Sequence, residues 1–217
     1  MAPARNDAWD CACGSGQATL PMSERFQRVI ATDPSDEQLR QAPPLPRVTW
    51  RVATAEESGL ATASVDAISV GQALHWFDLT RFWDEVRRVL RPGGVIVAWS
   101  YGLASVDDAA ITQAIRHFHD DVVGPYWPLE RGHVEARYRD IELPFARLPP
   151  PELDLRIVWT LDQLLGYLGT WSAVGRSIAA TGSDPLDAFT SQLRAIWGSG
   201  PRAVTWPLTI LAGRVGG

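Results

Sequence analysis

The residues best suited to bind a ligand form a small-residue turn near the start of the chain. Gly14, Ser15 and Gly16 follow a short apolar segment and precede a stretch that can be helical. Because glycine has no Cβ, such a turn lets a ligand approach the backbone and the first amides of the helix. Asp33 ends the next apolar segment, 17 residues after Gly16. This spacing predicts a cofactor with a nucleoside, whose ribose hydroxyls the carboxylate would bind.

Two classes of nucleoside cofactor use this geometry, the nicotinamide dinucleotides and S-adenosylmethionine. The dinucleotide pattern requires a third Gly or Ala three residues after Gly16, where the helix packs closely on the strand. Thr19 occupies that position. A nicotinamide-dependent oxidoreductase is therefore less favoured than a protein that binds S-adenosylmethionine.

His75 is the best placed candidate for a catalytic base. It follows the apolar segment 65–71, and open α/β sheets present functional groups at the carboxyl ends of their strands. The alternative, which we favour, is that His75 and the neighbouring Trp76 only pack the wall of a pocket.

Two histidines near the middle of the chain superficially suggest a metal site, because His117 and His119 precede Asp120 and Asp121. Residues two apart on a helix point in different directions, so the two histidines cannot chelate as an i, i+4 pair does. We expect an exposed helix face here and no metal.

Candidate acceptor-binding residues lie mostly in the second half. Arg131 and His133 could hold an acceptor carboxylate, for which the planar guanidinium is suited, or could belong to an ordinary charged loop. Trp76, Trp99 and Trp127 could line an apolar acceptor pocket, although an aromatic residue is by default part of the core.

Strands alternate with helices through the first half of the chain. Hydrophobic periodicity and the positions of breaking residues predict strands at 8–12, 29–32, 48–53, 65–71 and 95–99. They predict helices at 17–27, from 36, and at 80–91. Pro21 restricts the first helix, and Ser35 with Gln38 forms a capping-box pattern before the second. Strands joined by helical crossovers predict an α/β fold with a doubly wound, mostly parallel, Rossmann-like sheet and helices on both faces.

The regular alternation of strands and helices does not continue in the second half. There the sequence predicts a helix at 107–122, extended segments at 141–147 and 152–159, and a closing strand at 203–212. Thr160 with Gln163 forms a second capping-box pattern, which predicts a helix through 168. We expect one domain, residues 1–217, with a cofactor-binding half (1–104), an acceptor-side helical and extended lobe (105–202) and the closing strand (203–217).

Composition excludes several classes of function. The chain has 217 residues, a formal charge of −5 and no lysine, so it has neither a Schiff-base amine nor the lysine of a phosphate-binding P-loop. The acidic balance disfavours nucleic acid and anionic membranes as partners, and no apolar run is long enough to cross a bilayer.

Cys11 and Cys13 are too close for a comfortable disulfide, which favours a reducing, cytoplasmic compartment. The sequence makes no prediction of the oligomeric state.

Taken together, these motifs resemble those of the class I S-adenosylmethionine-dependent methyltransferases. Residues 10–16 resemble motif I of that family, and further motifs follow in the family's order at 31–35, 55–56, 65–68 and 90–94. Residues 72–78, 126–128 and 166–168 resemble the methyltransferase type 11 branch that includes trans-aconitate-methyltransferase-like proteins. The resemblance covers almost the whole chain.

The resemblance implies transfer of a methyl group from S-adenosylmethionine to a small-molecule acceptor, with a carboxylate as one candidate. It places Gly14, Ser15 and Gly16 near the methionine part of the cofactor and Asp10 at its amino group. The ribose would be held by Asp33. The remaining implied cofactor contacts are Ala55 and Glu56 around the adenine, and Gln72 and Ala73 at the far wall.

Two departures from the family pattern favour an alternative, a cofactor-impaired or non-catalytic binding protein of the same fold. Ala12 replaces the first glycine of motif I, and a left-handed backbone there would cost about 1 kcal/mol or more. Residues 1–7 are too few to form the helical segment that usually precedes the first strand and covers the cofactor in relatives.

Overall fold

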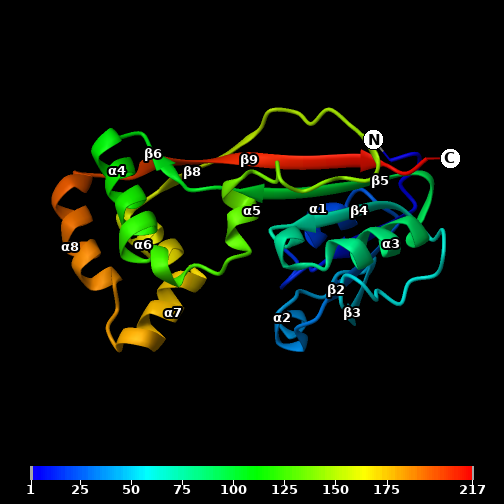
Figure 1. Cartoon of the computed structure of the whole chain (residues 1–217), viewed down its shortest axis with the longest axis horizontal. Helices are drawn as coiled ribbons and strands as arrows, with labels where there is room; N and C mark the ends of the chain where they lie inside the picture. Colours follow the sequence, from blue (N-terminus) through cyan, green and yellow to red (C-terminus); the bar gives the residue numbers. More distant parts are fainter. Residues whose placement is uncertain (1, 217) are drawn as a thin grey trace. The chain divides into compact units, whose positions relative to one another are not determined.

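The computed structural model describes residues 2–216, which divide into two compact units (Figure 1). The first unit comprises the chain up to Ser100, Arg137–Pro151 and the chain from Thr209. The second comprises Tyr101–Ala136 and Glu152–Leu208. Each unit has its own cluster of buried apolar side chains.

Parallel strands form most of the sheet of the first unit. Their spatial order is β3 (Val48–Val52), β2 (Arg28–Asp33), β1 (Asp7–Cys11), β4 (Val65–Gly71) and β5 (Leu90–Tyr101). The next strand in this order is β9 (Arg202–Arg214), whose end pairs antiparallel with β7 (Ala146–Arg147). All five residues of β1 are buried, as expected for a central parallel strand. The predicted α/β fold with a mostly parallel sheet is confirmed.

The helices of the first unit follow the predicted order but differ in length. They are α1 (Thr19–Ser23), α2 (Asp36–Arg40), the 3-10 turn η1 (Leu74–Trp76) and α3 (Leu79–Val89). Helix α1 is much shorter than the predicted 17–27 and contains Pro21, which lacks the amide that a longer helix would need.

Helix α3 buries the predicted apolar stripe of Phe82, Trp83, Val86 and Val89. It ends at Val89 rather than at residue 91, because Leu90 already pairs with Val65 as the start of β5. The segment 92–94 therefore lies inside β5, next to an irregularity in the β4–β5 register.

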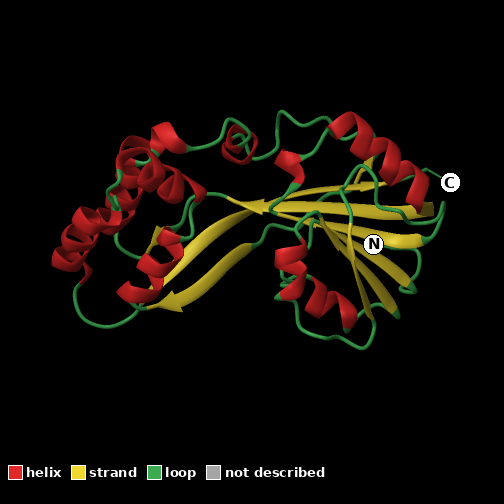
Figure 2. Cartoon of the chain, turned by 90° about the horizontal axis from the view of Figure 1, so that it is seen from below, coloured by secondary structure: helices red, strands yellow, loops and turns green. Residues whose placement is uncertain are grey.

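The second unit contains helices and the first part of β9, which pairs antiparallel with β6 (Ser105–Val106) and with β8 (Asp154–Trp159) (Figure 2). Its helical elements are α4 (Ala109–His117), the π-helical turn η2 (Phe118–Val122), the 3-10 turn η3 (Gly124–Tyr126), α5 (Arg131–Glu135), α6 (Leu161–Gly169), α7 (Ser172–Thr181) and α8 (Leu186–Trp197). Their core includes Ile111, Phe118, Leu164, Leu193 and Trp206.

One local prediction in the second half needed correction, and one helix was not predicted. The extended segment predicted at 141–147 contains strand pairing only at Ala146–Arg147. Helix α7 was not predicted, because neither a capping side chain nor an acidic first turn marks its start.

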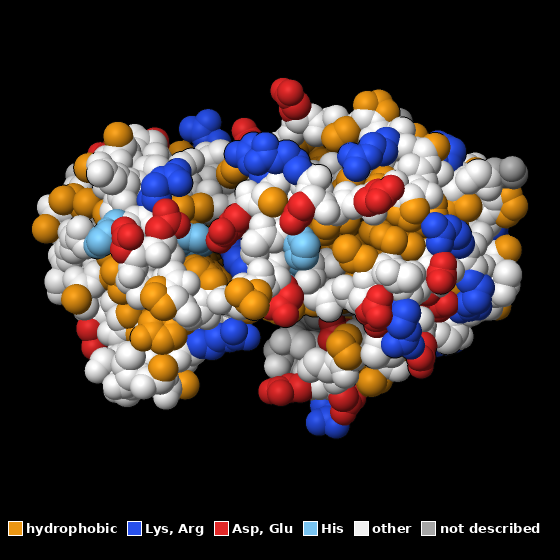
Figure 3. Space-filling model, in the orientation of Figure 1, with side chains coloured by type: hydrophobic (Ala, Val, Ile, Leu, Met, Phe, Trp, Pro, Cys, Tyr) orange, Lys and Arg blue, Asp and Glu red, His pale blue; other side chains and the backbone are white. Residues whose placement is uncertain are grey.

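Charged side chains of both signs are interspersed on the face shown in Figure 3. Across residues 2–216, none of the helices has both the length and the apolar character needed to cross a membrane.

Candidate functional site

A cavity of about 520 Å³ lies in the first unit, at the carboxyl ends of the parallel strands. This volume is within the range of small-molecule sites. The cavity brings together six of the residues predicted to bind the cofactor: Gly14, Asp33, Ala55, Glu56, Gln72 and Ala73. Four parts of the chain that are separate in sequence supply them, which supports the motif-based prediction of one site.

Asp33 is fixed at the cavity by two backbone hydrogen bonds. The Gly14 amide donates to Oδ2 and the Ser35 amide donates to Oδ1. Each of these hydrogen bonds has a donor–acceptor distance of 2.8 Å. The residue is 8% exposed. The carboxylate thus joins the glycine turn to the end of β2 and is oriented before any ligand arrives.

The backbone at the cavity is left-handed in several places. Gly14 has φ of 55°, and two residues with a Cβ share this conformation, Ala12 with φ of 54° and Gln72 with φ of 57°. All three line the cavity. The expected cost at Ala12 is therefore present, and strain of this kind is typical of ligand-binding loops.

Gly16 and Ser15 adjoin the cavity in sequence but do not line it. A Cβ on Gly16, whose φ is 93°, would lie 2.6 Å from the Trp50 ring of β3. Glycine is therefore required at this position by packing against the neighbouring strand as well as by backbone conformation.

Asp10, near the end of β1, does not line the cavity. It is 1% exposed and accepts a 2.5 Å hydrogen bond from the hydroxyl of Thr19. Burial raises its pKa to about 6, and the Thr19 hydrogen bond only partly opposes this rise. Thr19, the residue that breaks the dinucleotide pattern, therefore stabilises the Asp10 carboxylate.

The two cysteines beside Asp10 are free thiols and are buried. Burial raises the pKa of Cys13 to about 12 and that of Cys11 well above its ordinary value. Since the thiolate is the nucleophilic form, neither cysteine is suited to nucleophilic chemistry.

Six lining residues were not among the predicted site residues. Two of them, Gln38 and Thr54, carry side chains that can hydrogen-bond. The full set is Ala12, Pro34, Gln38, Thr54, Gly71 and Phe77, apart from Trp76, which was predicted as an acceptor contact.

The capping geometry of α2 explains why Gln38 was missed. Ser35 accepts from the Gln38 amide as a cap should, but its own amide is taken by Asp33. The Gln38 side chain therefore does not accept a hydrogen bond from the Ser35 amide, and it lines the cavity instead.

His75 lies beside the cavity wall and is 9% exposed. Its Nδ1 is 3.1 Å from the Tyr138 hydroxyl oxygen, and its ring packs against Trp76 with centroids 4.9 Å apart. Trp76 lines the cavity and is 51% exposed, whereas His75 does not line it. This arrangement favours the wall-packing interpretation of His75 over the catalytic one.

Trp99 also supports this wall. A Cβ on Gly71 would lie 2.5 Å from the Trp99 ring, so the indole crosses the end of β4 next to the cavity. Trp99 does not itself line the cavity.

The other predicted acceptor residues belong to the second unit. Trp127 donates from Nε1 to the carbonyl of His119 over 3.1 Å, and the Arg131 guanidinium lies 4.5 Å from the centre of the Trp127 ring. His133 lies half-buried on α5 and does not line the hollow that Trp127 and Arg131 line.

The prediction of an exposed face at the central histidines holds for His117 and is wrong for His119. His119 is 4% exposed, because the π-helical turn rotates it toward Trp127 and Trp171. Within residues 2–216, no group of His, Cys, Asp and Glu side chains could hold a metal ion.

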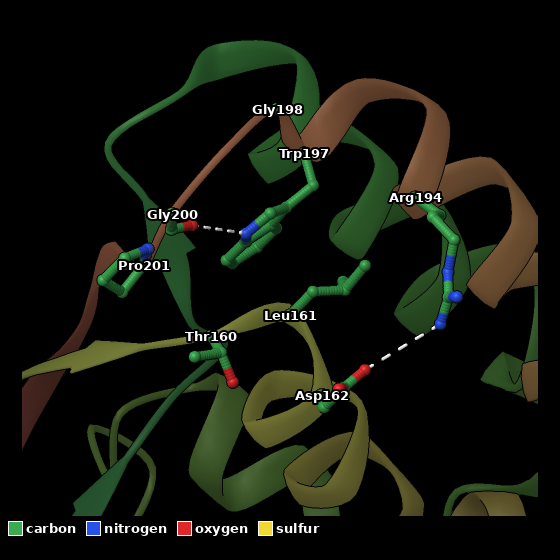
Figure 4. A pocket seen from close by; sticks show the side chains of 8 residues that line it. All are labelled: Thr160, Leu161, Asp162, Arg194, Trp197, Gly198, Gly200 and Pro201. Carbon is green, nitrogen blue, oxygen red and sulfur yellow. Dashed lines mark hydrogen bonds and ion pairs between the residues drawn. The ribbon is translucent and has the colours of Figure 1, made fainter.

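A further hollow of about 350 Å³ lies between α6 and α8 (Figure 4). Its indole donor, Trp197 Nε1, is bound to the Gly200 carbonyl over 3.0 Å. Arg194 lies 3.8 Å from Asp162, and both side chains are exposed. With its polar groups paired and no buried acid or base, this hollow offers no evident chemistry.

The strand order, the left-handed glycine turn and the backbone-held carboxylate at the end of β2 define a class I S-adenosylmethionine-dependent methyltransferase fold. Comparison with known proteins agrees. The family described as "Methyltransferase domain" matches residues 9–98. A Dictyostelium discoideum protein named as a methyltransferase is 34% identical over 191 residues, covering 87% of this chain and 73% of that protein. The chain belongs to the S-adenosylmethionine-dependent methyltransferases.

Solved structures show the same relationship. A structure described as a type II methyltransferase from Anaeromyxobacter dehalogenans has 50% identity and a TM-score of 0.91, over 100% of this chain and 93% of that one. The YcgJ protein of Bacillus subtilis, at 18% identity, has a TM-score of 0.58 over 100% of this chain and 94% of that one, which shows the fold alone.

Proposed function

We propose that the cavity of the first unit binds S-adenosylmethionine and that its methyl group passes to a small-molecule acceptor. The observation that carries this proposal is the Asp33 carboxylate, which two backbone amides hold at a cavity of about 520 Å³. Since the cofactor supplies an already activated methyl group, the protein has to orient the acceptor and exclude water.

The residues divide this task. Asp33 would bind the ribose hydroxyls, the Gly14 turn would face the methionine part, and Ala55 with Glu56 would flank the adenine. The Glu56 carboxylate also accepts a 3.0 Å hydrogen bond from the Asp78 amide, which ties it to the start of α3. Gln72 and Ala73 would close the far wall. Asp10 would act on the cofactor amino group from behind the turn.

The acceptor proposals are less closely tied to the cavity. Trp76 is exposed at its rim and is the first candidate for an acceptor contact. Trp99, Trp127, Arg131 and His133 remain predictions, as does a base role for His75. A carboxylate is the acceptor class to test first. A panel of small carboxylic acids is incubated with the chain and S-adenosylmethionine, and mass spectrometry detects any methyl ester formed.

Buried reduced thiols at Cys11 and Cys13 support the proposal that the chain works in the cytoplasm.

Cofactor binding is tested by calorimetric titration with S-adenosylmethionine and S-adenosylhomocysteine. We expect Asp33→Asn to weaken binding about tenfold to a hundredfold, because it replaces a charged acceptor of the ribose hydroxyls. Asp36→Asn is the matched control, since Asp36 is exposed and pairs with Arg40 on α2. Equal affinity of the wild type and Asp33→Asn would contradict the proposed site.

Ala12 favours a second candidate function, a binding protein of this fold with weakened cofactor affinity. Its left-handed φ of 54° places a Cβ on the turn that the family builds from glycine. Ala12→Gly should raise the free energy of unfolding by about 0.5–1 kcal/mol, since relief of the left-handed strain exceeds the added chain entropy. Ala18→Gly, at φ of −81°, should lower it.

The same variant separates the two functions. If the wild type binds S-adenosylmethionine in the titration, Ala12 is tolerated and the enzyme proposal stands. Binding that requires Ala12→Gly would instead identify a cofactor-impaired protein.

A further inference from the structure

The second unit contains a hollow of about 340 Å³ that shares no lining residue with the cavity of the first unit. Residues 119–135 supply all of its walls, from the π-helical turn η2, the η3 segment and helix α5. We call it the His119 pocket. π-Helical turns are rare and occur frequently at functional sites, because they change the direction of a side chain within an otherwise regular helix.

His119 is the buried polar group of this pocket. Its side chain is 5% exposed and lies among the rings of Trp127 and Trp171, at centroid distances of 4.9 and 5.5 Å. Its Nδ1 is 2.6 Å from the Asp120 carboxylate. A carboxylate only accepts hydrogen bonds, so neutral His119 carries its proton on Nδ1 and presents the lone pair of Nε2.

That lone pair has no hydrogen-bond partner among residues 2–216. The Glu135 Oε1 atom lies 3.8 Å from Nε2, which is too far for a hydrogen bond, and it is itself an acceptor. A buried acceptor without a donor is costly. A ligand that donates a hydrogen bond would remove this cost.

The charges at the pocket indicate which donor fits. Two carboxylates line it, Asp120 and Glu135, and both are about half exposed, whereas the one lining cation is Arg131. With His119 neutral, the lining charge is therefore −1. The Arg131 guanidinium lies over Trp127 and its Nε is 3.9 Å from the Glu135 carboxylate, so the cation already faces an anion. A ligand cation would meet an excess of acceptors, and an anion would meet two like charges.

We propose that the His119 pocket binds a small amine. The ammonium group donates to His119 Nε2 and is attracted by Glu135, while the apolar part of the ligand lies against Pro128 and Leu129. Leu129 is 95% exposed at the rim, where an apolar ligand body would cover it. This proposal concerns the second unit alone and does not rest on cofactor binding by the first.

Three probes of nearly equal shape test the proposal: benzylamine, benzyl alcohol and benzoate. Their binding to the full chain is measured without S-adenosylmethionine at about pH 8, where an ordinary imidazole is neutral and an alkylamine is charged. The Trp127 indole N–H signal in ¹H–¹⁵N NMR spectra locates the binding. We expect benzylamine to bind most tightly and benzoate least tightly, with the Trp127 signal shifting on addition of benzylamine.

Matched variants separate charge from shape. Glu135→Gln should weaken benzylamine binding at least fivefold and leave benzyl alcohol unchanged. Glu130→Gln makes the same change in charge just before α5, at an exposed residue that does not line the pocket, and should change neither. His119→Asn keeps an amide donor near the position of Nδ1 and removes the Nε2 acceptor, so it should weaken both probes.

Circular dichroism checks that the His119→Asn variant is folded, and the Glu135 variants carry the test if it is not. The proposal is overturned if benzoate binds as tightly as benzylamine. It is also overturned if Glu135→Gln and Glu130→Gln affect benzylamine equally, or if millimolar benzylamine leaves the Trp127 signal unmoved.

Discussion

Asp10 is a carboxylate enclosed by the central strand and the glycine turn, and its burial sets a stability that depends on pH. Its pKa of about 6 in the folded chain is above the ordinary value of 3.8 for an aspartate side chain. The folded state therefore holds the Asp10 proton more tightly than the unfolded chain does. The resulting destabilisation is absent below about pH 4, grows as the pH rises to about 6 and is complete above that, where it amounts to about 3 kcal/mol.

Asp10→Asn should remove most of this destabilisation, because the amide oxygen still accepts from Thr19 but carries no charge. After about 1 kcal/mol for the new amide donors, we expect the variant to exceed the wild type by about 2 kcal/mol in free energy of unfolding at pH 8. The advantage should disappear near pH 4. Urea denaturation at both pH values measures it, and a variant less stable than the wild type at pH 8 would contradict the expectation.

A buried charge of this kind is typical of a residue retained for binding rather than for stability. If Asp10 acts on the ammonium group of the cofactor, the same Asp10→Asn variant should bind S-adenosylmethionine more weakly while unfolding less readily. Asp36→Asn, on the exposed face of α2, provides the control for both measurements.

At the scale of elements, capping side chains show how far local sequence determines a helix boundary. Thr160 and Gln163 form both hydrogen bonds of a capping box at the start of α6, as their spacing predicts. Ser35 and Gln38 have the same spacing, yet only one of the two bonds forms, because Asp33 takes the Ser35 amide. The same pattern therefore produced a cap in one place and a cavity-lining side chain in the other.

Thr160→Ala should lower the free energy of unfolding by about 1 kcal/mol, since it leaves the Gln163 amide without its capping oxygen. Thr170→Ala is a matched control at the other end of α6, where the hydroxyl donates to a carbonyl instead of capping an amide. Thermal or chemical denaturation compares the two variants. Equal losses would show that the capping box does not set the stability of this helix.

At the scale of the whole molecule, net charge determines which partners can approach. The formal charge of −5 and the interspersed charges of Figure 3 offer no extended basic surface on that face. Non-specific association with nucleic acid draws most of its free energy from contacts of cations with phosphates.

We therefore expect no retardation of random duplex DNA or of single-stranded RNA by this chain at physiological ionic strength in an electrophoretic mobility assay. The same preparation should bind an anion exchanger, which shows that it is intact and carries the expected charge. Retardation of RNA that decreases with added salt would contradict the small-molecule acceptor and favour a nucleic-acid one.

The sequence by itself determined the features that depend on near neighbours. Alternating apolar segments and breaks predicted the parallel strands, and α3 was predicted from its apolar stripe. The glycine turn and Asp33 predicted a site where the structure has a cavity. The strand and helix patterns are complete within a few residues, because hydrogen bonding and side-chain direction in a single helix or strand are local. Asp33 lies 17 residues after Gly16, and the glycine turn and Asp33 are each placed at the end of one such strand.

Only the tertiary structure decided the contacts between distant residues. It placed Trp50 against Gly16, Tyr138 against His75 and Trp99 under Gly71. It also turned His119 inward and brought Gln38 and Thr54 to the cavity. These outcomes depend on how side chains from separate strands and helices fill shared space, and packing of this kind has no signature in the spacing of residues along one segment.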